Sequence, residues 1–390
     1  MLIKRDAESS IRSAARYFPV LAIIGPRQAG KTTLAQMVFP HHTYVSLEDL
    51  DMRSYATQDP RGFLDSYRTE HGIILDEFQH VPSLLSYIQT QVDREQKTGY
   101  FILTGSQNFL VNDAMTQTLA GRISIHTLLP LSIQELNQQS LLGDDADTYM
   151  YRGSYPPVYA KQVPADQWYR NYIQTYIERD VRQITNIGNL TTFQTFIQLC
   201  AGRIGQVINL TSLGNDCGIS ANTAKQWLSI LQASYIIFLL PPHYKNFSKR
   251  LIKSPKLYFY DTGLACSLLK ITATQLPTHY LKGGLFESLM IAEIAKHSYN
   301  QGMVPNLYFW RDQVGHEVDL IIDNGGVLTP IEIKAGKTIS NSFFDNLTYW
   351  KQLAHSDPAD GFLLYTGKDN QKRSNGTVLG WRSVTRVGNV

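Results

Sequence analysis

The first third of the chain alternates short apolar runs with longer segments in which apolar residues recur at helical spacing. The apolar runs, which predict strands, cover residues 20–24, 44–47, 73–76, 100–104 and 123–128. Helix-compatible sequence follows each of them, and residues 1–17 also show helical spacing. Strands that alternate with helices are typical of a parallel sheet covered by helices. The pattern therefore predicts an α/β fold for residues 1–148.

Beyond this part, residues 149–270 are predicted to form a mainly helical domain. Two short helices surround a tight turn at Gly218, with Thr211 and Ser220 as their N-terminal caps. Strand-like runs then follow at residues 235–240 and 256–260. A helix pair followed by a two-stranded ribbon is the order found in a winged helix.

A β-hairpin is predicted in the last part of the chain, residues 283–390, which follows a linker at 271–282. The dipeptide Asn324-Gly325 lies between two apolar runs, and this combination is a strong hairpin signal. A turn centred on the dipeptide would place Ile322 opposite Val327, and Asp319 opposite Pro330.

Charged side chains of this hairpin would share one face, because residues two apart in a strand point the same way. They are Asp319, Glu332 and Lys334. The two carboxylates could bind one Mg²⁺ or Mn²⁺ ion, with Lys334 beside an attacked phosphate. Glu287 lies in an apolar stripe of the preceding helix, where a carboxylate is costly unless a partner or a cation binds it. The alternative is a half-exposed hairpin with an ordinary ion pair.

The first predicted strand ends in a phosphate-binding pattern. Residues 25–32 read G-P-R-Q-A-G-K-T and match G-x-x-x-x-G-K-[ST] between a strand and a helix. Backbone N–H groups of such a loop surround phosphates at the positive end of the helix. Lys31 would reach the β and γ phosphates of ATP, and Thr32 would bind Mg²⁺. The expected nucleotide-binding residues are Gly25, Pro26, Arg27, Gln28, Ala29, Gly30, Lys31, Thr32 and Thr33.

A second part of this site is predicted at the end of the strand 73–76. Asp76 would hold the Mg²⁺ ion, and Glu77 would orient and polarise the attacking water. The strand 100–104 precedes Ser106 and Gln107, which could contact the γ-phosphate or simply form a turn. Arg122 is a candidate to stabilise transition-state charge, in its own subunit or across a subunit boundary of a homo-oligomer.

The composition is that of a globular protein, with 43% hydrophobic and 18% charged residues among 390. The net charge of +3 confines any nucleic-acid surface to a local patch. The three cysteines are far apart in the sequence, which argues against structural zinc and a disulfide framework. No signal sequence or membrane-spanning run is recognisable, so the expected location is the cytoplasm.

DNA is the expected partner of the predicted winged helix. Asn222, Lys225 and Gln226 would be exposed at the start of its second helix. The loop between the two strands adds four basic residues, namely Lys245, Lys249, Arg250 and Lys253. The alternative is a domain that only packs or contacts protein.

Several motifs together resemble the AAA+-like predicted ATPases of bacteria and archaea that end in a nuclease-like domain. They are G-P-R-Q-A-G-K-T-T, I-I-L-D-E, T-G-S-Q, L-A-G-R, Y-F-Y-D-T-G-L, G-L-F-E-S-L, Y-F-W-R-D, H-E-V-D-L and P-I-E-I-K-A-G. The last segments are similar to the PD-(D/E)XK nuclease core, which implies a restriction-endonuclease-like α/β domain. The resemblance implies a supporting metal role for Glu287, metal binding by Asp319 and Glu332, and transition-state contact by Lys334.

Two hypotheses follow for the whole chain. In the first, the ATPase, winged helix and nuclease-like domains form an ATP-driven enzyme that acts on DNA, with DNA endonuclease activity. In the second, the chain is a regulatory NTPase switch whose C-terminal domain binds without catalysis. Metal-dependent nicking of a plasmid would distinguish them.

Overall fold

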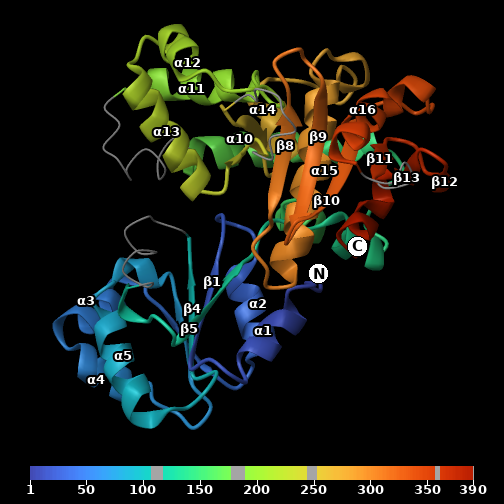
Figure 1. Cartoon of the computed structure of the whole chain (residues 1–390). Coiled ribbons are helices and arrows are strands. Elements are labelled where there is room, and N and C mark those ends of the chain that lie inside the picture. Colours follow the sequence, from blue (N-terminus) through green and yellow to red (C-terminus); the bar gives the residue numbers. More distant parts are fainter. Residues whose placement is uncertain (107–116, 177–188, 244–252, 356–360, 390) are drawn as a thin grey trace.

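The computed structural model describes residues 1–106, 117–176, 189–243, 253–355 and 361–389. Its N-terminal part is built on a five-stranded parallel sheet, which is seen in Figure 1. The strand order is β2-β3-β4-β1-β5. The strands are β1 (Val20–Ile24), β2 (Thr43–Ser46), β3 (Ile73–Asp76), β4 (Phe101–Gly105) and β5 (Ile123–Thr127). The predicted parallel α/β sheet is thereby confirmed, and β1 and β3 have the predicted bounds.

Helices cover both faces of this sheet (Figure 1). α1 (Glu8–Ala14) and α2 (Lys31–Val38) pack on one face, against Leu21 and Ile23 among others. The opposite face, with Val20 and Ala22, is covered by α3 (Leu50–Gln58), α4 (Pro60–Ser66) and α5 (Leu84–Glu95). Both faces are buried, which is why these strands are continuous apolar runs in the sequence. The short 3₁₀ helix η1 (Phe78–His80) follows β3.

The middle of the chain is mainly helical. It follows α7 (Ile133–Gln138) and contains α8 (Ala146–Arg152), α9 (Pro156–Ala160), α10 (Ala165–Tyr172), α11 (Leu190–Ala201), α12 (Leu210–Cys217), α13 (Ala221–Ala233) and α14 (Thr262–Leu268). Ser220 caps α13 as predicted, whereas the cap of α12 is Asn209 and not Thr211. The antiparallel strands β6 (Ile237–Leu240) and β7 (Lys256–Phe259) form a two-stranded ribbon.

A six-stranded mixed sheet forms the C-terminal part, in the order β12-β13-β11-β10-β9-β8. After η3 (Leu276–Thr278), the elements are α15 (Lys282–Asn300), β8 (Leu307–Arg311), β9 (Glu317–Asn324), β10 (Val327–Lys334), η4 (Asn341–Phe344), α16 (Asp345–Ala354), β11 (Phe362–Tyr365), β12 (Gln371–Arg373), β13 (Gly376–Gly380) and η5 (Trp381–Asn389). Its helix α15 packs against α14 and β7 of the middle part.

The predicted hairpin is present, but its register differs by two residues from the expectation. Asn324 pairs with Val327, so the turn residues are Gly325 and Gly326, with φ angles of 66° and 96°. Two adjacent residues at positive φ are compatible with glycine at both positions, and Gly325-Gly326 takes the place of the predicted Asn324-Gly325 in the turn. A register difference of two keeps every side chain on its predicted face.

None of the helices in the described residues is both long enough and apolar enough to cross a membrane.

Candidate functional site

The phosphate-binding loop connects β1 to α2, and its glycines are required by its geometry. Gly25 has a φ of 153°, and a Cβ atom there would lie 2.1 Å from the carbonyl oxygen of Leu128. Gly30 caps α2 in the left-handed conformation, with a φ of 94°. A side chain would clash at position 25 and would be strained by the positive φ at position 30, so glycine at both ends lets the loop wrap closely around a phosphate group.

Lys31 is the buried cation of this loop, with 5% of its surface exposed. Its Nζ atom donates a hydrogen bond to the carbonyl oxygen of Pro26 at 2.8 Å. Burial lowers the pKa of Lys31 to about 8, although the nearby carboxylates of Glu77 and Asp76 oppose this shift.

Three hydroxyl groups donate hydrogen bonds to the carboxylate of Asp76, at the end of β3. Thr32 Oγ1 donates to its two carboxylate oxygens at 2.9 and 3.1 Å, and Tyr44 OH donates to Oδ2 at 2.9 Å. Thr104 Oγ1 donates to Oδ1. Burial and the hydrogen bond to Asp76 raise the pKa of Tyr44 to about 12, so Tyr44 remains a donor. The adjacent hydroxyl and carboxylate oxygens of Thr32 and Asp76 form a donor set that fits Mg²⁺.

Glu77 follows β3 in a left-handed backbone conformation, with a φ of 54°. Such a conformation is uncommon for a residue with a side chain, and it occurs often at functional sites. The carboxylate accepts hydrogen bonds from Gln79 Nε2 and, at 3.4 Å, from Ser106 Oγ. Ser106 is thus brought to the candidate catalytic carboxylate, whereas its predicted partner Gln107 lies outside the described residues.

A cavity of about 470 Å³ opens at this loop. Its walls come from parts of the chain that are distant in sequence. They include residues 27–34 of the loop and α2, residues 1–3 and 5 of the N-terminus, and residues 156, 157, 160 and 161 around α9. Asp76 and Glu77 line it as well. The volume is within the range of ligand pockets in proteins.

Arg5 is a residue of this site that the sequence patterns did not identify. Its guanidinium group donates to the carbonyl oxygens of Ala29 at 2.7 Å and Leu129 at 2.6 Å. It also forms an ion pair of 2.9 Å with Glu135, which is fully buried. The capping box formed by Ser132 and Glu135 can be recognised in the sequence. The contact of Glu135 with Arg5 cannot, because the two residues are 130 positions apart.

Arg122 does not lie in the nucleotide pocket of its own chain. It precedes β5, whose first residue pairs with Val20, while the phosphate-binding loop follows the other end of β1. Five strand residues therefore separate it from the loop, or roughly 16 Å. Its guanidinium group forms two hydrogen bonds with Asp93 on the surface. The structure thus gives no support to the alternative within one subunit, and the role of Arg122 stays a prediction.

The charged residues predicted on the C-terminal hairpin lie together. Lys334 Nζ is 3.3 Å from Asp319 Oδ2 and 3.0 Å from Glu332 Oε2. Ile333 N donates to Asp319 Oδ2 at 2.8 Å. Glu332 is 1% exposed, and its Oε1 atom has no hydrogen-bond partner among the described residues. Burial and the charge of Asp319 raise the pKa of Glu332 well above its usual value.

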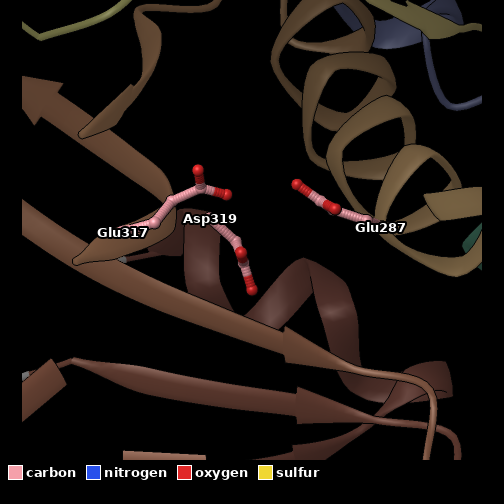
Figure 2. Close-up of side chains that lie close together, drawn as sticks. All are labelled: Glu287, Glu317 and Asp319. Atoms are coloured by element: carbon pink, nitrogen blue, oxygen red, sulfur yellow. The ribbon is translucent and has the colours of Figure 1, made fainter. Parts of the chain in front are cut away.

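Glu287 approaches the same hairpin from α15 (Figure 2). One carboxylate oxygen each from Glu287, Glu317 and Asp319 lie within 4.8 Å of one another, and we call these three residues the acidic cluster. Figure 2 shows the side chain of Glu287 directed from its helix toward Glu317 and Asp319 on β9. Burial raises the pKa of Glu287 above its usual value. The cluster thus has a donor set that fits a divalent cation.

Two residues at this cluster were not predicted. Glu317 is two positions before Asp319, and that spacing in a strand was a usable signal. Lys256, at the start of β7, forms ion pairs with Glu287 and Glu317, and no pattern near it in the sequence indicates this contact.

Exposed polar residues lie on α13 as expected, namely Asn222, Lys225 and Gln226. Of the four basic residues predicted for the following loop, Lys253 is exposed. Lys245, Lys249 and Arg250 lie outside the described residues.

Three family models match successive parts of the chain. One described as an AAA domain matches residues 17–137. Two described as domains of unknown function, DUF8612 and DUF4143, match residues 143–275 and 282–384. The AAA match includes the phosphate-binding loop, Asp76 and Glu77.

Two curated relatives are similar over most of the chain. They are the uncharacterized proteins Rv2008c of Mycobacterium tuberculosis and Mb2031c of Mycobacterium bovis. Each is 31% identical over 351 residues, which cover 88% of this chain and 76% of the relative.

Solved structures of ATPases are similar as well. The Walker-type ATPase of Pyrococcus abyssi has a TM-score of 0.46 at 11% identity, and the match covers 67% of this chain and 94% of that chain. The RuvB Holliday junction branch migration motor of Thermotoga maritima has a TM-score of 0.33 at 17% identity, with 61% and 90% covered.

Proposed function

This chain belongs to the same family as the two mycobacterial proteins and carries an AAA domain, and on that premise we propose that it hydrolyses ATP with Mg²⁺ at the phosphate-binding loop. The observation that carries the proposal is the contact of Thr32 Oγ1 with both carboxylate oxygens of Asp76. This contact brings together, beside the loop, the hydroxyl and carboxylate oxygens that hold Mg²⁺ in P-loop enzymes.

Each side chain of the pocket has a distinct role in this proposal. Lys31 and the loop N–H groups bind the β and γ phosphates, which lie at the positive end of α2. Glu77 orients the attacking water and accepts its proton, and Gln79 and Ser106 position the Glu77 carboxylate. Mg²⁺, when bound, neutralises the charge that develops on the phosphates.

Two variants test the ATPase. Lys31→Ala is expected to abolish tight ATP binding. Glu77→Gln is expected to bind ATP while its turnover falls by roughly 10²-fold or more, since a positioned base contributes 10²–10⁴-fold. Lys225→Ala, on the exposed face of α13, is the matched control and should hydrolyse ATP like the parent. Parental rates in both site variants would contradict the assignment.

A second candidate function is metal-dependent cleavage of DNA by the C-terminal domain. It is favoured by the side chains of Asp319, Glu332 and Lys334, which lie together on the hairpin. Lys334 Nζ donates to Glu332 Oε2 at 3.0 Å and to Asp319 Oδ2 at 3.3 Å. In this proposal Asp319 and Glu332 hold Mg²⁺ or Mn²⁺, Glu287 supports them, and Lys334 contacts the attacked phosphate. The exposed residues of α13 contribute DNA contact, as in a winged helix.

Nicking of supercoiled plasmid in Mg²⁺ or Mn²⁺ tests this second function. Asp319→Asn should remove cleavage and leave ATP hydrolysis intact, because the two sites lie on different sheets. Asp323→Asn is a matched control on the same hairpin, where an amide oxygen can still accept the hydrogen bond from Gly326 N. An intact ATPase without any nicking would favour the regulatory switch with a C-terminal binding module.

A further inference from the structure

A lysine from the middle of the chain occupies the acidic cluster of the C-terminal domain. Lys256 Nζ lies 3.0 Å from Glu287 Oε1 and also donates to Glu317 Oε1. Its side chain is 3% exposed. Tyr258, two residues further along β7, donates its hydroxyl to the same oxygen of Glu287. One strand of the β6–β7 ribbon therefore supplies two donors to the cluster.

The ribbon is held against the C-terminal sheet by backbone contacts as well. His243 N donates to Phe309 O at 2.7 Å, and Phe309 N donates to Pro241 O at 3.0 Å. The segment after β6 thus extends the edge of the sheet at β8. The insertion of Lys256 is one part of a continuous docking surface between the middle and C-terminal domains.

Other cations already surround these carboxylates. Arg311 Nη1 is 3.4 Å from Glu317 Oε2, and Lys334 contacts Asp319. Burial by itself lowers the pKa of Lys256, but the charges of Glu287, Glu317 and Asp319 outweigh it and hold the pKa above its usual value. Lys256 is therefore a permanent cation in this position.

The ammonium group lies where a shared metal ion would lie. A cation bound by Glu287 and Glu317 must sit between their carboxylates, and Lys256 Nζ contacts both of them. A divalent ion at the same place would repel the lysine at short range in a largely buried environment. The two cations cannot bind there together. Glu332 Oε1, buried and without a partner among the described residues, lies beside Asp319 and adds a further possible ligand.

We propose that Lys256 is a built-in cation that closes the acidic cluster, so that a divalent ion binds there only when β7 withdraws from α15 and β9. The docked ribbon then corresponds to a closed state of the C-terminal domain. Movement of the middle domain would open the cluster. This inference rests on the cation site of the second candidate function, but it does not require that the site cleaves DNA.

Binding of Mn²⁺ to the nucleotide-free full-length protein, followed by electron paramagnetic resonance, tests the inference. Lys256→Met should bind Mn²⁺ at least tenfold more tightly than the parent, and addition of Asp319→Asn should abolish the gain. Lys253→Met, an exposed residue just before β7, is the matched control and should bind like the parent. If Lys256→Met does not fold, Lys256→Gln removes the charge and keeps a hydrogen-bond donor, with the same expected gain.

Hydrogen exchange on the parent protein provides a second measurement. Saturating Mn²⁺ should increase amide exchange in Lys256–Phe259, because the ion displaces the strand. Equal and measurable Mn²⁺ affinity in the parent and the lysine variants would overturn the closure by Lys256, although the cation site itself would be supported. Bound Mn²⁺ with unchanged exchange in β7 would overturn the closure in the same way. Absence of Mn²⁺ binding in every variant would overturn both the cation site and the closure.

Discussion

Lys296 Nζ lies 2.7 Å from Glu293 Oε1 on α15, and this buried ion pair connects all three parts of the chain. Lys296 also donates to Leu131 O, at the end of the AAA domain, and to Ser154 Oγ in the middle domain. Glu293 Oε2 accepts from Ile133 N at 2.6 Å. The same helix carries Glu287 of the acidic cluster, so α15 contacts the surroundings of both candidate sites.

Loss of this lysine should destabilise the protein strongly. Lys296→Met would leave Glu293, which is 1% exposed, buried without its cation. We expect the free energy of unfolding to fall by about 3–5 kcal/mol, as for other broken buried pairs. Urea denaturation measures this change. The double variant with Glu293→Gln should lose less than the sum of the single changes. A loss within about 0.5 kcal/mol, typical of surface substitutions, would contradict the prediction.

Arg5 should affect nucleotide affinity through the backbone of the phosphate-binding loop. Arg5→Met removes the hydrogen bond to Ala29 O and leaves Glu135 buried without its cation. We expect ATP affinity to fall by roughly tenfold, equivalent to about 1.4 kcal/mol. Equilibrium binding of a fluorescent ATP analogue measures the change. Arg170→Met, which removes an exposed ion pair with Asp166, is the control. Unchanged affinity in Arg5→Met would show that the loop keeps its shape without this contact.

Arg122 is predicted to complete the site of a neighbouring subunit. Arg122→Ala and Lys31→Ala should each be inactive alone, whereas a mixture should recover part of the ATPase activity, because mixed interfaces pair an intact loop with an intact arginine. Sedimentation with a non-hydrolysable ATP analogue should show assembly. A parent protein that is fully active as a monomer would exclude this role for Arg122.

His126 should make the protein sensitive to acid. It lies on β5, is 5% exposed, and burial lowers its pKa from 6.5 to about 4. Since the folded pKa is below the unfolded one, its contribution to stability is complete above about pH 6.5 and is lost as the pH falls toward 4. Between pH 7 and 4.5 the parent should lose on the order of 2 kcal/mol more stability than His126→Gln. Urea denaturation at the two pH values tests this.

The control for this titration is Ile125→Val, an exposed position of β5 that carries no titratable group. Its stability should depend on pH as in the parent. An identical loss on acidification in the parent and His126→Gln would contradict the assignment to His126.

Local patterns in the sequence were sufficient to predict the N-terminal sheet and its loop. β1 and β3 coincide with the predicted strands, because both of their faces are buried and an apolar run ends where burial ends. The glycines at 25 and 30 were recognisable because the loop needs glycine at fixed positions, through a close approach to Leu128 at position 25 and a positive φ at position 30. The roles of Lys31, Thr32, Asp76 and Glu77 remain proposals that rest on this geometry.

The side-chain directions of the C-terminal hairpin were predictable from the sequence, but its register was not. The alternation of side chains in a strand predicted that Asp319, Glu332 and Lys334 would lie together, and the hydrogen bonds of Lys334 confirm this. The pattern did not predict the register, because two overlapping dipeptides, Asn324-Gly325 and Gly325-Gly326, can each form the turn. Pairing of the two strands decided between them.

Only the tertiary structure decided which cation meets the acidic cluster. Lys256 is 31 residues from Glu287 and 61 from Glu317, and it begins an otherwise apolar strand. Strand and helix periodicities extend over a few residues, so they determine which way a side chain points from its own element and not what it meets there. Packing of the β6–β7 ribbon on α15 and β9 brings these charges together, and burial then requires that they neutralise one another.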